Sequence, residues 1–169
     1  MFARLLEELE SHGQLENTVI VGVTDHYTYG FDDVQKLLEV SGVTEEFHLE
    51  KTPCFIWSAD GPSMEFSKTL NTSDLLPTVL NLMGVDSPYH YLGRDAFDKN
   101  YVGYALFSDG SWIVDGVLWR PEYGDNMQLL TEDAKPLTPE QVEQINAYLV
   151  EYGQISNLLL ITDYYRKVR

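Results

Sequence analysis

Basic residues are scarce in this 169-residue sequence: 11 Lys and Arg stand against 27 Asp and Glu, so the formal net charge is −16. Binding to DNA or RNA needs a basic surface, so this charge balance argues against a nucleic-acid partner. An acidic surface also repels anionic lipid headgroups and keeps a protein in solution. We therefore expect a soluble chain that binds no nucleic acid.

Cysteine and long hydrophobic runs are also nearly absent. Cys54 is the single cysteine, so no disulfide forms within the chain, and its apolar neighbours lead us to expect a buried, inert thiol. No stretch reaches the roughly 18 to 20 apolar residues that are needed to span a bilayer. We expect no signal peptide at the start of this sequence, because Arg4, Glu7, Glu8 and Glu10 interrupt its first segment.

The first half of the sequence alternates helical and extended patterns. Apolar residues recur at helical spacing in residues 2–9 and 33–40, and they form continuous runs in residues 18–24 and 53–58. Such runs are typical of strands that are covered on both faces, as in a parallel sheet. Ser73 or Asp74 can cap a third helix that ends at Gly84. Because two strands alone make a poor parallel sheet, we expect further strands from sequence upstream.

The second half has a different pattern. Short apolar runs are separated by Asp109-Gly110 and Asp115-Gly116, which predicts antiparallel hairpins. Thr138–Gln141 is a capping box with proline at the first helical position, and it opens a helix that we expect to end near Gly153. A last helix is expected to reach Tyr165.

The predicted fold class is α/β. Residues 1–100 are expected to form a partial parallel sheet with flanking helices. Residues 101–169 are expected to form a small antiparallel sheet with C-terminal helices packed on it.

An Asp-His pair directly follows the first apolar run, in "NTVIVGVTDHY". Ligands of open α/β sheets bind beyond the carboxyl ends of strands, which is where Asp25 and His26 lie. Consecutive side chains of a strand point to opposite faces, so both reach one ion only if the chain bends there. A carboxylate and an imidazole suit Mn²⁺ or Zn²⁺ better than Ca²⁺. The alternative is a solvated aspartate beside a partly exposed histidine.

Other polar residues have plainer interpretations. Asp74 is expected to cap a helix or to lie in its first turn, and Thr78 is expected to be a helix residue rather than a nucleophile. We expect His90 to lie in a surface loop, with a substrate contact as the alternative. His12 and His48 are expected to be exposed and to have no functional role.

Several segments resemble a known family. In this order, "NTVIVGVTDHY", "TPCFIWS" and "NTSDLLPTVLNLMGV" resemble the distal half of the alkaline phosphatase and sulfatase superfamily. Within it, "LGRDAF", "FSDGSWIVDGVLW" and "SNLLLITDYYR" resemble the lipoteichoic acid synthase branch, which comprises membrane-anchored phosphoglycerol transferases. The resemblance covers nearly the whole chain, and it implies that residues 1–100 are the distal part of the family's α/β core.

The resemblance also implies roles for three residues. In that family a single divalent metal, usually Mn²⁺, is held by a Glu, the nucleophilic Thr, an Asp and a His. The last two correspond to Asp25 and His26, and Tyr27 corresponds to a tyrosine beside the substrate pocket. The Glu and the Thr belong to the upstream half, so no catalytic residue is expected here, and the metal should be weakly bound or absent in the isolated chain. The family often has Gly before the Asp-His pair, where this sequence has Thr24.

The implied function is transfer of glycerol phosphate from a lipid donor to a growing polymer, by a membrane-anchored parent whose catalytic domain is extracellular. This chain would be a C-terminal fragment that is inactive alone, with the upstream half as its partner. One alternative is part of a sulfatase or phosphodiesterase hydrolase. Another is a non-catalytic binding module or degenerate paralogue. An unpaired strand edge and an apolar docking face also predict self-association, with the helix around Phe2, Leu5, Leu6 and Leu9 near the contact.

Overall fold

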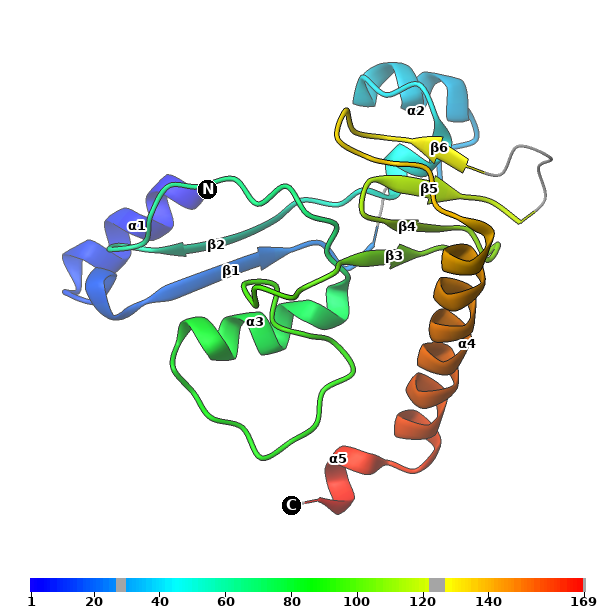
Figure 1. Ribbon diagram of the computed structural model, residues 1–169. Helices are drawn as coiled ribbons and strands as arrows, with labels where there is room; N and C mark the ends of the chain where they lie inside the picture. The colour runs from blue at the N-terminus through cyan, green and yellow to red at the C-terminus, as the bar shows by residue number, and fades with distance from the viewer. Residues whose placement is uncertain (27–29, 122–126, 169) are drawn as a thin grey trace. The chain divides into compact units, whose positions relative to one another are not determined.

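The protein is described by a computed structural model, which covers residues 1–26, 30–121 and 127–168. These residues form two compact units, Met1–Glu65 and Phe66–Arg169, whose α-helices and strands are labelled in Figure 1. The division expected at residue 100 stays a prediction.

The first unit is built on a two-stranded sheet. Its elements are α1 (Phe2–Ser11), η1 (Leu15–Asn17), β1 (Val19–Val23), α2 (Val34–Ser41), η2 (Glu46–Glu50) and β2 (Cys54–Ser58), where η denotes a 3₁₀ helix. Strands β1 and β2 pair in an antiparallel register that runs from Val19 opposite Ser58 to Val23 opposite Cys54.

The prediction of a partial parallel sheet is wrong for this chain, because β1 and β2 are antiparallel. A helix between two strands usually marks a crossover that carries the chain back to the start of the first strand. Here α2 and η2 lie in a connection that leaves β1 after Val23 and enters β2 at Cys54, and these two residues are partners. The connection therefore starts and ends at the same end of the sheet.

The strands are also less covered than the sequence predicts. Phe2 of α1 meets the rings of Phe55 and Trp57 edge-on, with centroids 5.4 Å and 6.2 Å away, so α1 packs on one face of the sheet. The other face carries Val19, Val21 and Val23, whose exposed fractions are 41%, 37% and 47%. An apolar run thus indicates a strand with apolar surface on both faces, and among the described residues of this unit helix α1 packs on one face, whereas the valines of the other face stay partly exposed.

Cys54 begins β2 on the less covered face and is exposed, so the expected buried thiol is wrong. Partial desolvation nevertheless raises the pKa of its thiol above the ordinary value.

The second unit combines helices with a meander. Its elements are η3 (Thr72–Asp74), α3 (Leu75–Leu82), β3 (Tyr104–Leu106), β4 (Trp112–Val114), β5 (Val117–Trp119), β6 (Met127–Leu129), α4 (Pro139–Ile161) and α5 (Tyr164–Lys167). Strands β3 to β6 pair antiparallel in sequence order, which confirms the predicted small antiparallel sheet with C-terminal helices. The β4–β5 turn is Asp115-Gly116 with φ of 47° and 72°, as expected for a two-residue hairpin that twists with its strands.

The core of this unit lies between the sheet and α4. Trp112 is 1% exposed and stacks on Trp119 with centroids 5.4 Å apart, and its indole N–H donates a 2.8 Å hydrogen bond to Asn146 of α4. Tyr104 packs edge-on against Tyr152 of the same helix. The aromatic residues of the hairpins are therefore structural.

Helix α4 begins as predicted, because the side chain of Thr138 accepts the N–H of Gln141 and the side chain of Gln141 accepts the N–H of Thr138. It does not end near Gly153 but continues to Ile161. A single glycine costs a helix only about 1 kcal/mol, and no proline follows to stop it. Across the described ranges, no helix combines the length and the apolar character needed to cross a membrane.

Candidate functional site

The Asp-His pair lies where the chain leaves the sheet of the first unit. Asp25 and His26 follow β1 by two and three residues, and the chain bends at both positions. The Nε2 atom of His26 lies 3.5 Å from Oδ2 of Asp25. Their side chains are 49% and 87% exposed, respectively, so water and a substrate can reach both. The bend brings together two side chains that a regular strand would direct to opposite faces.

This geometry fits two ligands of one ion. Ligand atoms about 2.1 Å from a metal and separated by a tetrahedral angle are roughly 3.4 Å apart, which is close to the spacing between His26 and Asp25. An imidazole nitrogen and a carboxylate oxygen are donors that suit Mn²⁺ and Zn²⁺. The same 3.5 Å spacing also fits a direct contact between the two side chains, so metal binding by the pair stays a prediction.

Further ligands do not converge on this pair within the described part of the chain. No group of three or more His, Cys, Asp or Glu side chains there could enclose a metal ion. Tyr27, the residue expected beside the substrate, lies outside the described residues. The assignment of Asp25, His26 and Tyr27 to a functional site therefore stays a prediction from the sequence.

Asp74 belongs to the second unit and has a structural role. It is 1% exposed, and its carboxylate accepts hydrogen bonds from the backbone N–H groups of Asn71 and Arg94 and from the hydroxyl of Tyr101, at 3.0, 2.8 and 2.7 Å. The bond from Asn71 completes a capping box at η3, which confirms the predicted capping role. Burial, and then this hydrogen bond to Asp74, raises the pKa of the Tyr101 phenol far above its ordinary value.

Thr78 and His90 also behave as the plainer interpretations predict. Thr78 is a buried residue of α3 whose hydroxyl donates to the Asp74 carbonyl and accepts the Ala96 N–H. His90 is an exposed loop residue whose carbonyl accepts a 3.0 Å hydrogen bond from the hydroxyl of Tyr165.

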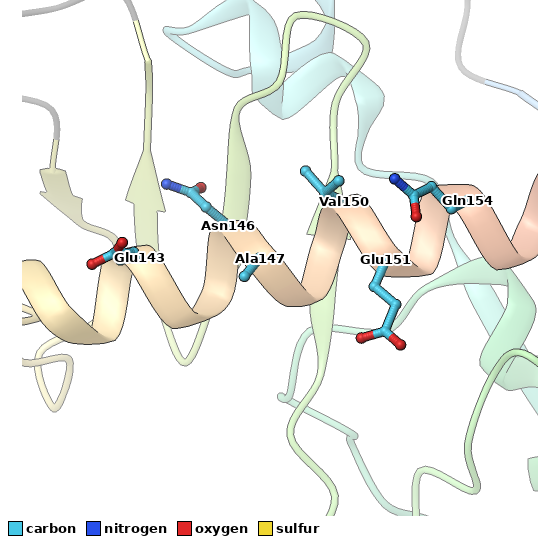
Figure 2. Close-up of a pocket in the computed structure, with 6 residues that line it drawn as sticks. All are labelled: Glu143, Asn146, Ala147, Val150, Glu151 and Gln154. Carbon is cyan, nitrogen blue, oxygen red and sulfur yellow. The ribbon is translucent and has the colours of Figure 1, made fainter.

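A shallow hollow runs along α4, and Figure 2 shows that all of its labelled side chains come from this one helix. Its two carboxylates, Glu143 and Glu151, are eight residues apart, which places them about 12 Å apart along the helix axis. Two carboxylates at that distance cannot share a metal ion or a proton. Asn146 in the same hollow already accepts the bond from Trp112. This surface brings together no group that could carry chemistry.

A second hollow lies in the first unit, between the end of α2 and η2. Its polar lining residues are Ser41, Thr44, His48 and Lys51. The sequence predicts that His48 is exposed and has no functional role, but His48 is half-buried. The sequence predicts no role for the other three. Their positions follow from the turn after α2 and from the geometry of η2, which sequence spacing alone does not reveal.

Comparison with known proteins identifies the class to which the fold and the Asp-His pair belong. The sulfatase family model matches residues 1–85, which is half of the chain and includes both β strands of the first unit and the Asp-His pair. The chain belongs to the sulfatase family.

The chain is also similar to lipoteichoic acid synthase 2 of Bacillus subtilis (strain 168). The two are 27% identical over 116 residues, which are 65% of this chain and 18% of that protein. Together with the family match, this similarity confirms the resemblance to lipoteichoic acid synthases that the motifs predict. The chain spans less than a fifth of the length of this relative.

Proposed function

We propose that this chain is part of a metal-dependent phosphoglycerol transferase in which Asp25 and His26 supply two metal ligands. The observation that carries the proposal is the 3.5 Å approach of these side chains at the end of β1, within the segment that matches the sulfatase family. The similarity to a lipoteichoic acid synthase supports transfer of glycerol phosphate from a lipid donor. Mn²⁺ is the proposed metal.

A bound divalent metal would lower the pKa of a coordinated nucleophile and offset negative charge on the phosphoryl oxygens. The chain's own contribution is to orient donors. The bend after β1 turns the Asp25 carboxylate and the His26 imidazole toward the same side. The carboxylate would then offer a negative charge, and the imidazole a nitrogen lone pair, to the same ion. Tyr27 is the proposed substrate contact, next in sequence.

The remaining ligands and the nucleophile are proposed to come from sequence outside these 169 residues, in a parent protein anchored in the membrane with its catalytic domain outside the cell. The less covered face of the β1–β2 sheet supports this, because Val19, Val21 and Val23 offer an apolar surface for further structure. The chain alone should therefore be inactive.

A hydrolase of the same family is the second candidate, because the matching family model is that of sulfatases. It would use the same Asp25 and His26 but pass the phosphoryl or sulfuryl group to water instead of a polymer hydroxyl. Product analysis separates the two: a transferase extends an acceptor, whereas a hydrolase releases free glycerol phosphate or sulfate.

The test is an assay of the isolated chain with Mn²⁺ and bis(p-nitrophenyl) phosphate. We expect no release of p-nitrophenol above the metal-only blank, since no nucleophile is expected beside the pair. Manganese-dependent turnover that Asp25→Ala abolishes would overturn the proposal that the chain needs a partner segment.

A further inference from the structure

The hollow between α2 and η2 lies at the same end of the sheet as the Asp-His pair. The β1–β2 ladder ends with Val23 opposite Cys54. Asp25 follows Val23 by two residues and Lys51 precedes Cys54 by three, so the backbones of both lie within about 10 Å of that end. The backbones of Asp25 and Lys51 are therefore at most about 20 Å apart, and the hollow has a volume of about 540 Å³.

The charge of the hollow contrasts with that of the whole chain. Acidic residues outnumber basic ones by 27 to 11, yet none of the hollow's lining residues is an Asp or Glu, and Lys51 and His48 both line it. The hydroxyls of Ser41 and Thr44 add two hydrogen-bond donors, and Leu37 and Leu49 form an apolar wall. A cationic group with neighbouring hydroxyl donors is the usual environment for an oxyanion.

Local geometry places His48 and Lys51 on the same side. The N–H of Lys51 donates a 3.2 Å hydrogen bond to the carbonyl of His48, which closes the last turn of η2. Lys51 directly follows η2 with an extended backbone, and both its side chain and that of His48 line the hollow. The imidazole of His48 is further fixed by the ring of Phe47, with centroids 4.0 Å apart.

The turn after α2 positions the hydroxyls. Gly42 adopts a φ of 68°, which only glycine takes without strain, and the N–H of Val43 bonds the carbonyl of Leu38 at 3.1 Å. This capping motif places Ser41 and Thr44 on either side of Gly42 at the rim of the hollow. The C-terminal end of α2 carries about half a negative charge at most, which the full charge of Lys51 exceeds.

The ammonium of Lys51 is available to a ligand. In the described parts of the chain, no carboxylate or other acceptor pairs with this side chain, and Lys51 is exposed. Glu46 and Glu50 lie on the same turn but do not line the hollow. An oxyanion would thus meet Lys51 without displacing a carboxylate.

We propose that this hollow, which we call the Lys51 hollow, binds a phosphate group. The further statement that this phosphate belongs to the substrate of the Asp25-His26 pair rests on the proposed function. A phosphodiester polymer or lipid headgroup would then place one phosphate at the pair and a neighbouring one in the hollow.

The test is an NMR titration of the ¹⁵N-labelled 169-residue chain with inorganic phosphate at constant ionic strength, with EDTA present. EDTA separates this test from the proposed function, because the Lys51 hollow needs no metal. We expect saturable shifts of the amides of residues 41–51. Lys51→Gln should weaken binding about tenfold, because it removes a charge-assisted hydrogen bond, and Lys51→Arg should largely preserve it.

Lys36→Gln is the matched control, since Lys36 is an exposed lysine of α2 that does not line the hollow. It removes the same charge and should leave the affinity unchanged. Shifts that do not saturate, or that are equal in the Lys51→Gln and Lys36→Gln chains, would overturn the proposal. Each variant's spectrum also reports whether it folds.

Two further probes identify the source of the phosphate. Soluble glycerol phosphate tests a free ester or polymer end, and phosphatidylglycerol vesicles, compared with phosphatidylcholine vesicles, test a lipid headgroup. Lys51-dependent binding of either supports the hollow as a phosphate site, and binding of neither contradicts its assignment to a substrate.

Discussion

The hydroxyl of Tyr101 donates a 2.7 Å hydrogen bond to the carboxylate of Asp74, a residue 27 positions earlier and only 1% exposed. Because Asp74 also accepts the backbone N–H of Arg94, it fastens the loop after α3 to the start of that helix. We expect Asp74→Ala to lower the free energy of unfolding by about 2–4 kcal/mol, since it leaves the half-buried N–H groups of Asn71 and Arg94 without an acceptor and leaves the Tyr101 hydroxyl only the Thr69 carbonyl. Urea unfolding measures this loss.

The control for Asp74 is Asp86→Asn, a change to an exposed aspartate of the same unit. It should alter the free energy of unfolding by less than about 0.5 kcal/mol. Equal effects of the two substitutions would show that the hydrogen bonds to Asp74 contribute little.

The second unit should lose stability in alkaline solution. Burial is the main cause that raises the pKa values of Tyr101 and Tyr104, and for Tyr101 the hydrogen bond to Asp74 adds to it. Among the described residues, the buried hydroxyl of Tyr104 has no hydrogen-bond partner. In the unfolded chain these phenols ionise near pH 10, so there the unfolded state binds fewer protons than the folded state. The contribution of these two phenols to the free energy of unfolding should be constant below that pH. Above it, this contribution should fall by up to about 1.4 kcal/mol per pH unit for each phenol.

Urea unfolding between pH 8 and 11 tests the alkaline loss. Tyr101→Phe should make the decline shallower, whereas Tyr89→Phe, a change in a loop tyrosine, should leave its slope unchanged. A decline that is identical in all three chains would contradict this origin.

Two glycines of the second unit should respond to alanine with opposite signs. A Cβ at Gly103 would lie 1.7 Å from the carbonyl oxygen of Thr69, which is backbone and cannot move aside freely. Gly153 lies within α4 and nothing approaches its Cβ position within 4 Å. Gly153→Ala should therefore stabilise the protein by up to about 1 kcal/mol, and Gly103→Ala should destabilise it strongly.

Thermal unfolding of the two alanine variants measures both effects. A lower midpoint for Gly153→Ala would show that the middle of α4 is not helical in solution.

The apolar face of the first unit should cause self-association. Val21 is at the centre of β1 and 37% exposed, on the face that α1 does not cover. Added salt should strengthen association, because it screens the repulsion between chains of charge −16. Val21→Lys should shift the protein toward the monomer in sedimentation experiments.

Val40→Lys is the control for association, because Val40 is a 78% exposed valine of α2. If the unsubstituted chain is a strict monomer at tens of micromolar, at low and high salt, the apolar face is not a docking surface. A self-sufficient, non-catalytic module would then be favoured over a part of an enzyme.

The sequence predicts local structure better than pairing direction. The Asp115-Gly116 turn and the Thr138 capping box are chemical signals within four residues, and both are found where they were expected. The direction of β1 against β2 depends on where a 30-residue connection returns, which apolar periodicity does not encode. The same limit applies to the exposure of strand residues. An apolar run shows that a strand can be buried, but it does not show which other segment buries it.

In the candidate site, too, local motifs are predictable from the sequence and long-range contacts are not. The bend at Asp25 and His26 agrees with the requirement that both side chains reach one ion, and the motif places the pair at the end of β1. The Lys51 hollow has no motif, because its residues come from a helix end and a 3₁₀ turn that only the folded chain brings together. The network around Asp74 likewise joins residues up to 27 positions apart.

The central claim is that Asp25 and His26 together bind a divalent metal, and paramagnetic NMR with Mn²⁺ tests it most directly. Substoichiometric Mn²⁺ should broaden the amide signals around Asp25 and His26 first, with weak affinity because two ligands leave the ion mostly hydrated. Asp25→Asn and His26→Gln should each remove this selective broadening, and His12→Gln, a change to an exposed histidine of the same unit, should not. Broadening that starts elsewhere, or that persists unchanged in both variants of the pair, would contradict the claim.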